Sequence, residues 1–161
     1  MFRVGLGQDS HKIKCKVQSA KCKISRLGGI ELKNWEIIAN SDGDVIIHAL
    51  CNALNTAIGY GSLDLYAGPM FKKGITDSRE YLKVALKMAK ERGYKVNNLA
   101  LMIEAQKPRL EKHREKICQS LAKILEMNQS QIGMAFTSGE GLTAFGKGKG
   151  IQVFCLVSLL K

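Results

Sequence analysis

Three side chains of the kind that bind divalent metal ions are spaced so that they could meet. Asp9 and His11 are two positions apart, so on an extended backbone both side chains point the same way. His48 follows Asp44 by four positions in an apolar run that suits a helix, which puts those two residues on one face. One carboxylate and two imidazoles are ligands that zinc accepts, with a fourth position left for a substrate. The pattern indicates a catalytic zinc or other divalent-metal site, although a surface His11 and a packed His48 would look the same.

Two other segments could hold an anion. Residues 41–44, Ser-Asp-Gly-Asp, open the apolar run, and free amide hydrogens at a helix N-terminus favour negative charge. An ordinary cap is the alternative, with Ser41 and the acidic residue three positions on forming a capping box. Residues 137–141 offer hydroxyls and flexible backbone amides to a diphosphate, and residues 146–150 add two lysines. A plain hairpin loop would have a similar sequence.

The composition predicts one compact domain over residues 1–161, since a chain of 161 residues that is 45% apolar can bury a sizeable core. The net charge of +11 favours an anionic partner. No aromatic residues of the sort that stack on bases are interleaved with the early cations, so we interpret those cations as a solvated surface and expect neither nucleic acid nor a membrane as partner. The early cations are Lys12, Lys14, Lys16, Lys21, Lys23, Arg26 and Lys33.

The cellular compartment is predicted from the apolar runs and the cysteines of the sequence. No run of about 18 apolar residues could span a bilayer, and Arg3 and Asp9 interrupt any signal-peptide core. The five cysteines are odd in number and have no C-x-x-C pair, which favours unpaired thiols in a reducing compartment. We expect a cytoplasmic protein. A plastid is the alternative location if a transit peptide has been removed.

The elements that must position these side chains follow from hydrophobic spacing. The spacing predicts helices over 45–58, 77–92 and 110–126, and strands over 2–8, 96–105, 132–138 and 151–160. The fold class is therefore predicted as α+β, an α/β sandwich with a mixed four-stranded sheet, three helices on one face and a small N-terminal hairpin.

Two segments are assigned by their lack of regular spacing. Glycines and Pro69 predict a loop over residues 61–75, and ordered loops of that length are usually functional or mobile. His113 lies among charged residues and is expected to face solvent rather than a metal.

Taken together, the motifs resemble the 2-C-methyl-D-erythritol 2,4-cyclodiphosphate synthase family nearly end to end. The order and spacing of six segments carry the resemblance: V-G-L-G-Q-D-S-H at 4–11, N-S-D-G-D-V-I-I-H-A-L at 40–50, D-S-R-E at 77–80, A-Q-K-P-R-L at 105–110, T-S-G-E-G-L at 137–142 and G-K-G-K-G-I at 146–151.

The resemblance implies an enzyme of the phosphorus-oxygen lyase class. In that family a phosphate on the methylerythritol end of 4-diphosphocytidyl-2-C-methyl-D-erythritol 2-phosphate attacks the β-phosphorus, which forms the cyclic diphosphate and expels CMP in non-mevalonate isoprenoid synthesis. The resemblance also implies a zinc ion, a magnesium ion bridging the two phosphates, and a homotrimer with active sites between adjacent subunits.

The family's functional residues map onto this sequence position by position. Asp9, His11 and His48 match the zinc ligands, and Asn40 and Ser138 stand where the family has a histidine and a threonine that stabilise the transition state. The positions that match phosphate or substrate contacts are Ser41, Ser62, Asp64, Thr137, Gly139, Glu140 and Lys147. The positions that match the cytidine loop are Ala105, Gln106, Lys107, Pro108, Arg109 and Leu110.

Three departures leave two hypotheses open. Asn40 donates a hydrogen bond but carries no charge, Asn52 replaces an acidic residue one turn after His48, and the segment 61–75 lacks most of the acidic contacts to the sugar alcohol. A divergent lineage with a rebuilt substrate loop would still be an enzyme, which is the reading we favour because all three metal positions keep competent side chains. The alternative is a zinc-containing cytidine-nucleotide-binding homologue without turnover. A basic nucleic-acid-binding domain, which rests on charge alone, ranks far lower.

Overall fold

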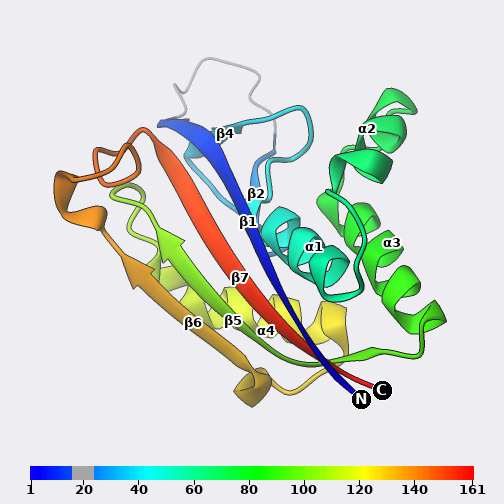
Figure 1. The fold of residues 1–161 in the computed structure, drawn as a ribbon. Coiled ribbons are helices and arrows are strands. Elements are labelled where there is room, and N and C mark those ends of the chain that lie inside the picture. The colour runs from blue at the N-terminus through cyan, green and yellow to red at the C-terminus, as the bar shows by residue number, and fades with distance from the viewer. Residues whose placement is uncertain (16–23) are drawn as a thin grey trace.

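A five-stranded mixed sheet forms the centre of the fold (Figure 1). The computed structural model describes residues 1–15 and 24–161. In the strand order β4-β1-β7-β5-β6, every neighbouring pair is antiparallel except β5 and β6, which run parallel. The strands are β1 (Phe2–Cys15), β4 (Trp35–Ile38), β5 (Lys95–Glu104), β6 (Ile132–Thr137) and β7 (Gly150–Leu160).

The N-terminal strand is longer than predicted, and it has an additional partner. The prediction of a four-stranded sheet was wrong because β4, only four residues long, pairs with residues 12–15 of β1 and becomes an edge strand. Asp9 and His11 therefore lie within β1 and not at its end. Of the expected hairpin, β2 (Arg26–Leu27) and β3 (Ile30–Glu31) form a two-stranded ladder, while Lys16, Lys21, Cys22 and Lys23 lie outside the described residues.

Four α-helices accompany the sheet, one more than predicted. The described helices are α1 (Val45–Ala57), α2 (Asp64–Lys72), α3 (Ser78–Glu91) and α4 (Arg114–Leu125). The prediction of an irregular loop over 61–75 was wrong because α2 lies inside it, Pro69 included. Buried Leu63 and Ala67, with Tyr66 and Met70 packed against the core, show that tertiary packing overrides the weak helix propensity of this segment.

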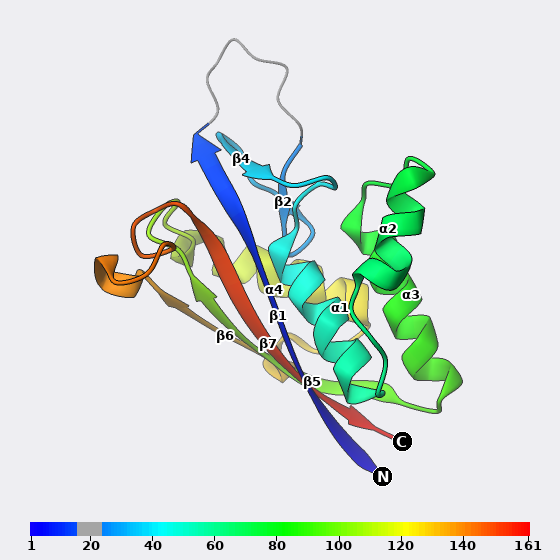
Figure 2. The same ribbon diagram turned by 45° about the horizontal axis from the view of Figure 1, so that its top comes forward.

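The helical layer lies against one face of the sheet. Figures 1 and 2 show α1 along β1 and β7, α3 beside α1, and α4 under the β5–β6 side. Along β7 the side chains that face the helices are all buried: Ile151, Val153, Cys155, Val157 and Leu159. Within the described ranges, none of the helices has the length and apolar character needed to cross a membrane.

The opposite face of the sheet exposes large apolar side chains. The exposed fractions are 58% for Leu6, 50% for Met102, 43% for Phe154 and 42% for Leu156. These four residues come from β1, β5 and β7, which are adjacent strands, so they form one surface. We call them the outer apolar face.

The packing of α1 on β1 depends on two glycines. A Cβ atom on Gly5 would lie 2.0 Å from the carbonyl oxygen of Ala53, and one on Gly7 would lie 2.1 Å from that of Ala49. No side chain fits at those distances, so the helix approaches the strand more closely than any other residue would allow. This contact fixes the distance of α1 from β1. It also fixes the position of His48, because that residue belongs to α1.

Candidate metal centre

The structure brings Asp9, His11 and His48 together at one point. Oδ2 of Asp9 lies 3.0 Å from Nε2 of His11 and 3.0 Å from Nδ1 of His48, and the two nitrogens are 3.1 Å apart. Three atoms with lone pairs this close repel one another unless positive charge lies between them. A zinc ion at its usual distance of about 2.0–2.2 Å from nitrogen and oxygen fits above such a triangle, so the donor set suits the metal.

The charge on Asp9 is held by its two neighbours. Burial opposes ionisation of this carboxyl, but the hydrogen bonds with His11 and His48, together with their charge, outweigh it and keep the pKa of Asp9 well below its ordinary value of 3.8. Its carboxylate is therefore ionised at any physiological pH. An ionised carboxylate is the form that binds a metal ion.

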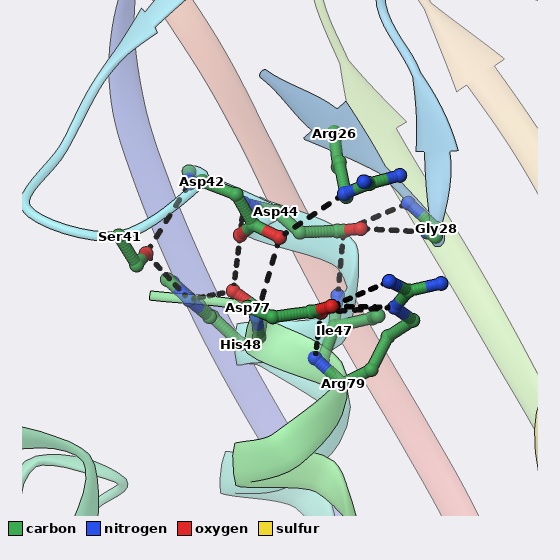
Figure 3. Close-up of polar contacts among 12 residues, drawn as sticks. Arg26, Gly28, Ser41, Asp42, Asp44, Ile47, His48, Asp77 and Arg79 are labelled. Atoms are coloured by element: carbon green, nitrogen blue, oxygen red, sulfur yellow. Dashed lines mark hydrogen bonds and ion pairs between the residues drawn. The ribbon is translucent and has the colours of Figure 1, made fainter. Parts of the chain in front are cut away.

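The second ring nitrogen of His48, Nε2, lies near two hydroxyl groups. Nε2 lies 2.8 Å from Oγ of Ser78, the first residue of α3, and 3.4 Å from Oγ of Ser41 (Figure 3). The hydroxyl of Ser78 in turn bonds a carboxylate oxygen of Asp42 at 2.5 Å. His48 is thus in contact with polar groups on both of its ring nitrogens.

The start of α1 is built around Asp44, and not Ser41. Asp44 is the N-cap, and its fully buried carboxylate accepts hydrogen bonds from the amides of Gly28, Gly29 and Ile47 at 2.7, 2.6 and 3.1 Å. Burial raises the pKa of Asp44, against the lowering by these amides. The expected capping box led by Ser41 was wrong, since the hydroxyl of Ser41 accepts from Gly43 and faces His48. The amide of Ile47 at the helix start is thus occupied by the chain's own carboxylate.

A pocket of about 230 Å³ opens beside the three ligand residues. It contains five further positions expected from the sequence to serve the site or to alter it: Asn40, Ser41, Asn52, Ser62 and Asp64. The rest of its lining was not named residue by residue from the sequence, although four of these residues lie in the segment 61–75 that was predicted as a substrate loop: Ala39, Leu63, Ala67, Gly68, Phe71 and Tyr81. Because most of these belong to α2 or to the turn before it, the unpredicted helix forms one wall of the candidate site.

Asn52 connects the start of α2 to β1, the strand that contains Asp9 and His11. Its Oδ1 accepts from the amide of Leu63 at 2.9 Å, and its Nδ2 donates to the carbonyl of Gln8 at 3.2 Å. The amide donor is required for the second bond, because a carboxylate would repel the carbonyl oxygen. Asn52 therefore positions the beginning of α2 relative to Asp9. Among the described residues, the side chain of His48 bonds Asp9, His11, Ser41 and Ser78 but not Asn52.

The remaining expected site residues lie elsewhere in the chain. Residues 105–110 follow β5, and residues 137–147 follow β6; the amide of Ala105 donates to the carbonyl of Thr137, and that of Gln106 to the carbonyl of Phe145. Figures 1 and 2 show these loops at the β5–β6 side of the sheet and α2 at the other. Within one chain the expected cytidine and diphosphate loops meet each other but do not line the pocket beside the metal ligands.

A carboxylate that the sequence did not single out holds the two loops together. Glu104, the last residue of β5, accepts a hydrogen bond from the hydroxyl of Thr143, which itself accepts from the amide of Gly146 at 2.9 Å. Gly139 has a φ of +67°, and a Cβ there would lie 2.1 Å from Oε1 of Glu104. We call Glu104, Gly139, Thr143 and Gly146 the loop clasp.

The loop expected to bind cytidine contains one buried side-chain atom that has no hydrogen-bond partner among the described residues. This atom is Oε1 of Gln106. The peptide bond between Lys107 and Pro108 is cis. His113, which was expected to face solvent rather than a metal, is partly exposed at the end of the short helix η1 (Glu111–His113). The third predicted helix therefore begins as a 3₁₀ turn and becomes α-helical at Arg114.

Comparisons with known proteins agree with this fold. The model of the YgbB family matches residues 2–160. A protein of Chlamydia muridarum named 2-C-methyl-D-erythritol 2,4-cyclodiphosphate synthase is 39% identical, with 100% of this chain and 89% of that protein aligned.

Solved structures give the same result. An IspF–CDP complex of Plasmodium falciparum superposes with a TM-score of 0.83 at 28% identity, covering 99% of this chain and 96% of the other. A CDP-bound 2C-methyl-D-erythritol-2,4-cyclodiphosphate synthase gives 0.84 at 29% identity, covering 98% and 100%. A full-length match to the family model and this identity over the whole chain place the protein: it belongs to the YgbB family.

Proposed function

We propose that this chain is a 2-C-methyl-D-erythritol 2,4-cyclodiphosphate synthase and that it belongs to the phosphorus-oxygen lyases. It converts 4-diphosphocytidyl-2-C-methyl-D-erythritol 2-phosphate to the cyclic diphosphate and CMP in non-mevalonate isoprenoid synthesis. The observation that carries the proposal is the convergence of Asp9, His11 and His48 within 3.1 Å beside an open pocket, in a chain 39% identical to a protein of that name.

Asp9, His11 and His48 hold the metal, which we take to be zinc from the one carboxylate and two imidazoles. When bound, zinc polarises a phosphoryl oxygen as a Lewis acid and gives it a fixed position. The attacking phosphate of the substrate is already ionised, so the chain does not need a strong base. Its task is to align the two phosphates for in-line displacement.

The other residues bind and orient the substrate. Asn40 and Ser41 lie at the pocket beside the metal ligands, where the amide of Asn40 donates to a phosphate oxygen. Ser62 and Asp64, at the start of α2, receive the hydroxyls of the sugar alcohol. Ser138 donates to the transition state, and Thr137, Gly139, Glu140 and Lys147 surround the diphosphate.

Residues 105–110 bind the cytidine. The buried, unpartnered Oε1 of Gln106 supports this assignment, because a buried acceptor normally has a donor, and the amino group of a cytosine is a donor. The described residues contain one group of three or more metal-ligating side chains. Magnesium is accordingly assigned to the phosphates of the substrate, and assays should contain it.

The active enzyme is a homotrimer with sites between subunits. Two features of the single chain support this. The outer apolar face exposes large side chains on three adjacent strands, which is typical of an interface. The cytidine and diphosphate loops lie across the sheet from the metal pocket, so a complete site needs the loops of a neighbouring subunit.

Residues 1–161 act as one catalytic domain in a reducing compartment such as the cytoplasm. The core cluster includes residues from β1 to β7, which supports a single folding unit. Cys51, Cys118 and Cys155 are buried free thiols, as expected where disulfides are not formed.

Release of CMP tests the function. The purified chain, loaded with zinc and supplied with magnesium, should convert the cytidine diphosphate substrate to CMP and the cyclic diphosphate, followed by chromatography and phosphorus NMR. His48→Ala should abolish both bound zinc and turnover. A zinc-loaded chain that binds CDP but releases no CMP would contradict the enzyme and leave a cytidine-nucleotide-binding protein.

A further inference from the structure

The tautomer of His48 decides whether it can bind a metal. Nδ1 of His48 faces Asp9 and His11, so this nitrogen must offer its lone pair to the metal. A neutral imidazole has one N–H, and in this case the hydrogen must be on Nε2. A group that accepts a hydrogen bond from Nε2 would therefore hold the ring in its metal-binding form.

Ser78 is placed to be that acceptor. Its hydroxyl oxygen lies 2.8 Å from Nε2 of His48, and the residue is fully buried at the start of α3. A hydroxyl can donate only one hydrogen, and the hydroxyl of Ser78 bonds Oδ1 of Asp42 at 2.5 Å. An ionised carboxylate can only accept, so the hydrogen of Ser78 goes to Asp42, and its lone pair is left for the N–H of His48.

Asp42 is itself held by several donors. The amides of Ser78 and Asp44 each donate to its carboxylate at 3.2 Å, and Nε of Arg26 lies 3.7 Å away (Figure 3). Its backbone is fixed too, because its amide donates to the carbonyl of Thr76 at 2.9 Å. The carboxylate is therefore oriented before any metal binds.

Ser41 is the weaker alternative for the same role. Its hydroxyl oxygen is 3.4 Å from Nε2 of His48, at the limit of a hydrogen bond, and already accepts from the amide of Gly43 at 3.2 Å. It also lines the pocket, where we have assigned it to phosphate. The shorter contact and the connection to a carboxylate favour Ser78.

We propose that Ser78 and Asp42 are positioning residues for the metal ligand His48, forming a relay in which Nε2–H donates to the Ser78 hydroxyl and that hydroxyl donates to Asp42. The inference rests on the proposed metal site. In this relay a hydroxyl stands between the histidine and the carboxylate that usually orients a histidine ligand directly. The side chain one turn after His48, Asn52, instead bonds the amide of Leu63 and the carbonyl of Gln8.

The relay connects two segments far apart in the sequence. Ser78 belongs to the D-S-R-E segment at the start of α3, where Asp77 is the N-cap, and Asp42 belongs to the S-D-G-D segment before α1. Each segment looks like a helix start when taken alone. Their contact explains why α3 must begin beside His48.

Zinc affinity, measured by competition with a chelator, tests the relay without depending on turnover. Ser78→Ala removes the hydroxyl from a buried site without adding bulk, and the dissociation constant for zinc should rise about 10–100-fold, the usual effect of losing an outer hydrogen bond to a histidine ligand. Ser78→Thr keeps the hydroxyl and should restore most of the affinity. The visible spectrum of bound Co²⁺ should change in Ser78→Ala and return in Ser78→Thr.

Ser25→Ala is the matched control. Ser25 is also buried and its hydroxyl accepts from the amide of Ile37 at 2.8 Å, but among the described residues it is not one of the hydrogen-bond partners of His48. The zinc affinity of the Ser25→Ala variant should stay within about twofold of that of the wild type. A folded Ser78→Ala chain with unchanged zinc affinity would overturn the relay, and so would an equal loss in Ser25→Ala.

The relay and the proposed activity can fail separately. If the wild type binds zinc but does not release CMP, the activity is wrong, while the chelator competition still decides the relay. If the wild type binds neither zinc nor Co²⁺, both are wrong.

Discussion

At the scale of single residues, the site depends on charge that is compensated before any ligand arrives. Against the effect of burial, hydrogen bonds with two histidines lower the pKa of Asp9, and the buried carboxylate of Asp44 has three amide donors. The same rule explains why the sequence alone could propose metal ligands but not Ser78 or Asp42 as their supports. Ligand atoms are recognisable by residue type and spacing, whereas their supports come from distant segments through tertiary contacts.

The pH dependence of stability should reveal the low pKa of Asp9. A carboxyl whose pKa is lowered on folding contributes stability above its ordinary value of 3.8 and loses it as the pH falls further. In metal-free protein, Asp9→Asn should therefore lower the free energy of unfolding by about 1 kcal/mol at pH 5, because hydrogen bonds to a charged acceptor are lost.

Urea unfolding in the presence of a chelator measures this difference. Lowering the pH from 5 to about 2.5 should shrink the gap between wild type and Asp9→Asn, since the carboxyl of the unfolded wild-type chain is then protonated while that of the folded chain is still ionised. A gap that is constant or that grows in acid would contradict the assigned pKa direction.

Asn52 should act on the pocket wall rather than on the metal. Asn52→Ala removes the acceptor for the amide of Leu63, so hydrogen exchange should speed up over residues 62–66, and KM for the substrate should rise several-fold with little loss of zinc. Hydrogen-exchange mass spectrometry and steady-state kinetics measure both effects.

Thr56→Ala provides the comparison for that experiment. The hydroxyl of Thr56 donates from the same helix to the carbonyl of Leu6 in β1 at 2.9 Å, without reaching α2. It should cost about 1 kcal/mol of stability, as one hydrogen bond does, and leave exchange over 62–66 unchanged. Faster exchange in both variants would point to general loosening of α1.

At the scale of elements, the sequence predicted long periodic segments and missed short or irregular ones. The helices over 45–57, 78–91 and 114–125 follow from spacing and from cap residues such as Asp77. The strand β4 and the helix α2 could not be predicted from spacing. A four-residue edge strand forms because its partner strand pairs with it, and a helix that contains Pro69 forms because it packs against the core. The missed helix forms a wall of the pocket, so the site was predicted less completely than the fold.

The close contact of α1 with β1 can be tested at Gly7. In Gly7→Ala the new Cβ would lie 2.1 Å from the carbonyl oxygen of Ala49 and 2.3 Å from the amide nitrogen of Ala53, so α1 must move away. We expect a loss of about 2–4 kcal/mol in the free energy of unfolding, and weaker zinc binding because His48 precedes Ala49.

Gly133→Ala is the matched change in a strand. Its added Cβ would find its nearest neighbours at 3.8 Å, an ordinary contact, so stability and zinc affinity should change little. Denaturant unfolding and chelator competition measure both variants. Normal zinc affinity in Gly7→Ala would show that the distance of α1 from β1 does not set the metal site.

The loop clasp should control nucleotide binding. Gly139→Ala combines a φ of +67° with a clash against Oε1 of Glu104, while Gly141→Ala has a φ of +75° and no neighbour within 4 Å. Gly141→Ala should therefore cost about 1 kcal/mol, and Gly139→Ala should cost more and weaken CDP binding.

A double mutant separates the two costs at Gly139. Glu104→Ala removes the clashing carboxylate, so Glu104→Ala with Gly139→Ala should be less damaging than the sum of the single changes. Unfolding free energies and calorimetric CDP affinities give the coupling. Strict additivity would show that the clasp does not hold the loop.

At the scale of the whole molecule, the two halves of the proposed site lie apart in one chain. The metal ligands and α2 belong to one side, and the loops after β5 and β6 to the other. The sequence could assign residues to both halves through the resemblance, but their separation within a subunit depends on the strand order β4-β1-β7-β5-β6, which no local pattern encodes.

This separation makes assembly and metal binding distinguishable by experiment. Phe154→Glu places a charge on the outer apolar face, where burial between subunits would cost several kcal/mol, so the chain should become monomeric by light scattering. Leu65→Glu changes an exposed apolar residue of α2 and should leave assembly intact. The monomer should still bind zinc with wild-type affinity, because all three proposed ligands come from one chain. It should release no CMP, because in the proposed trimer the nucleotide loops come from a neighbour. A Phe154→Glu monomer with full turnover would show instead that one chain completes the site by itself.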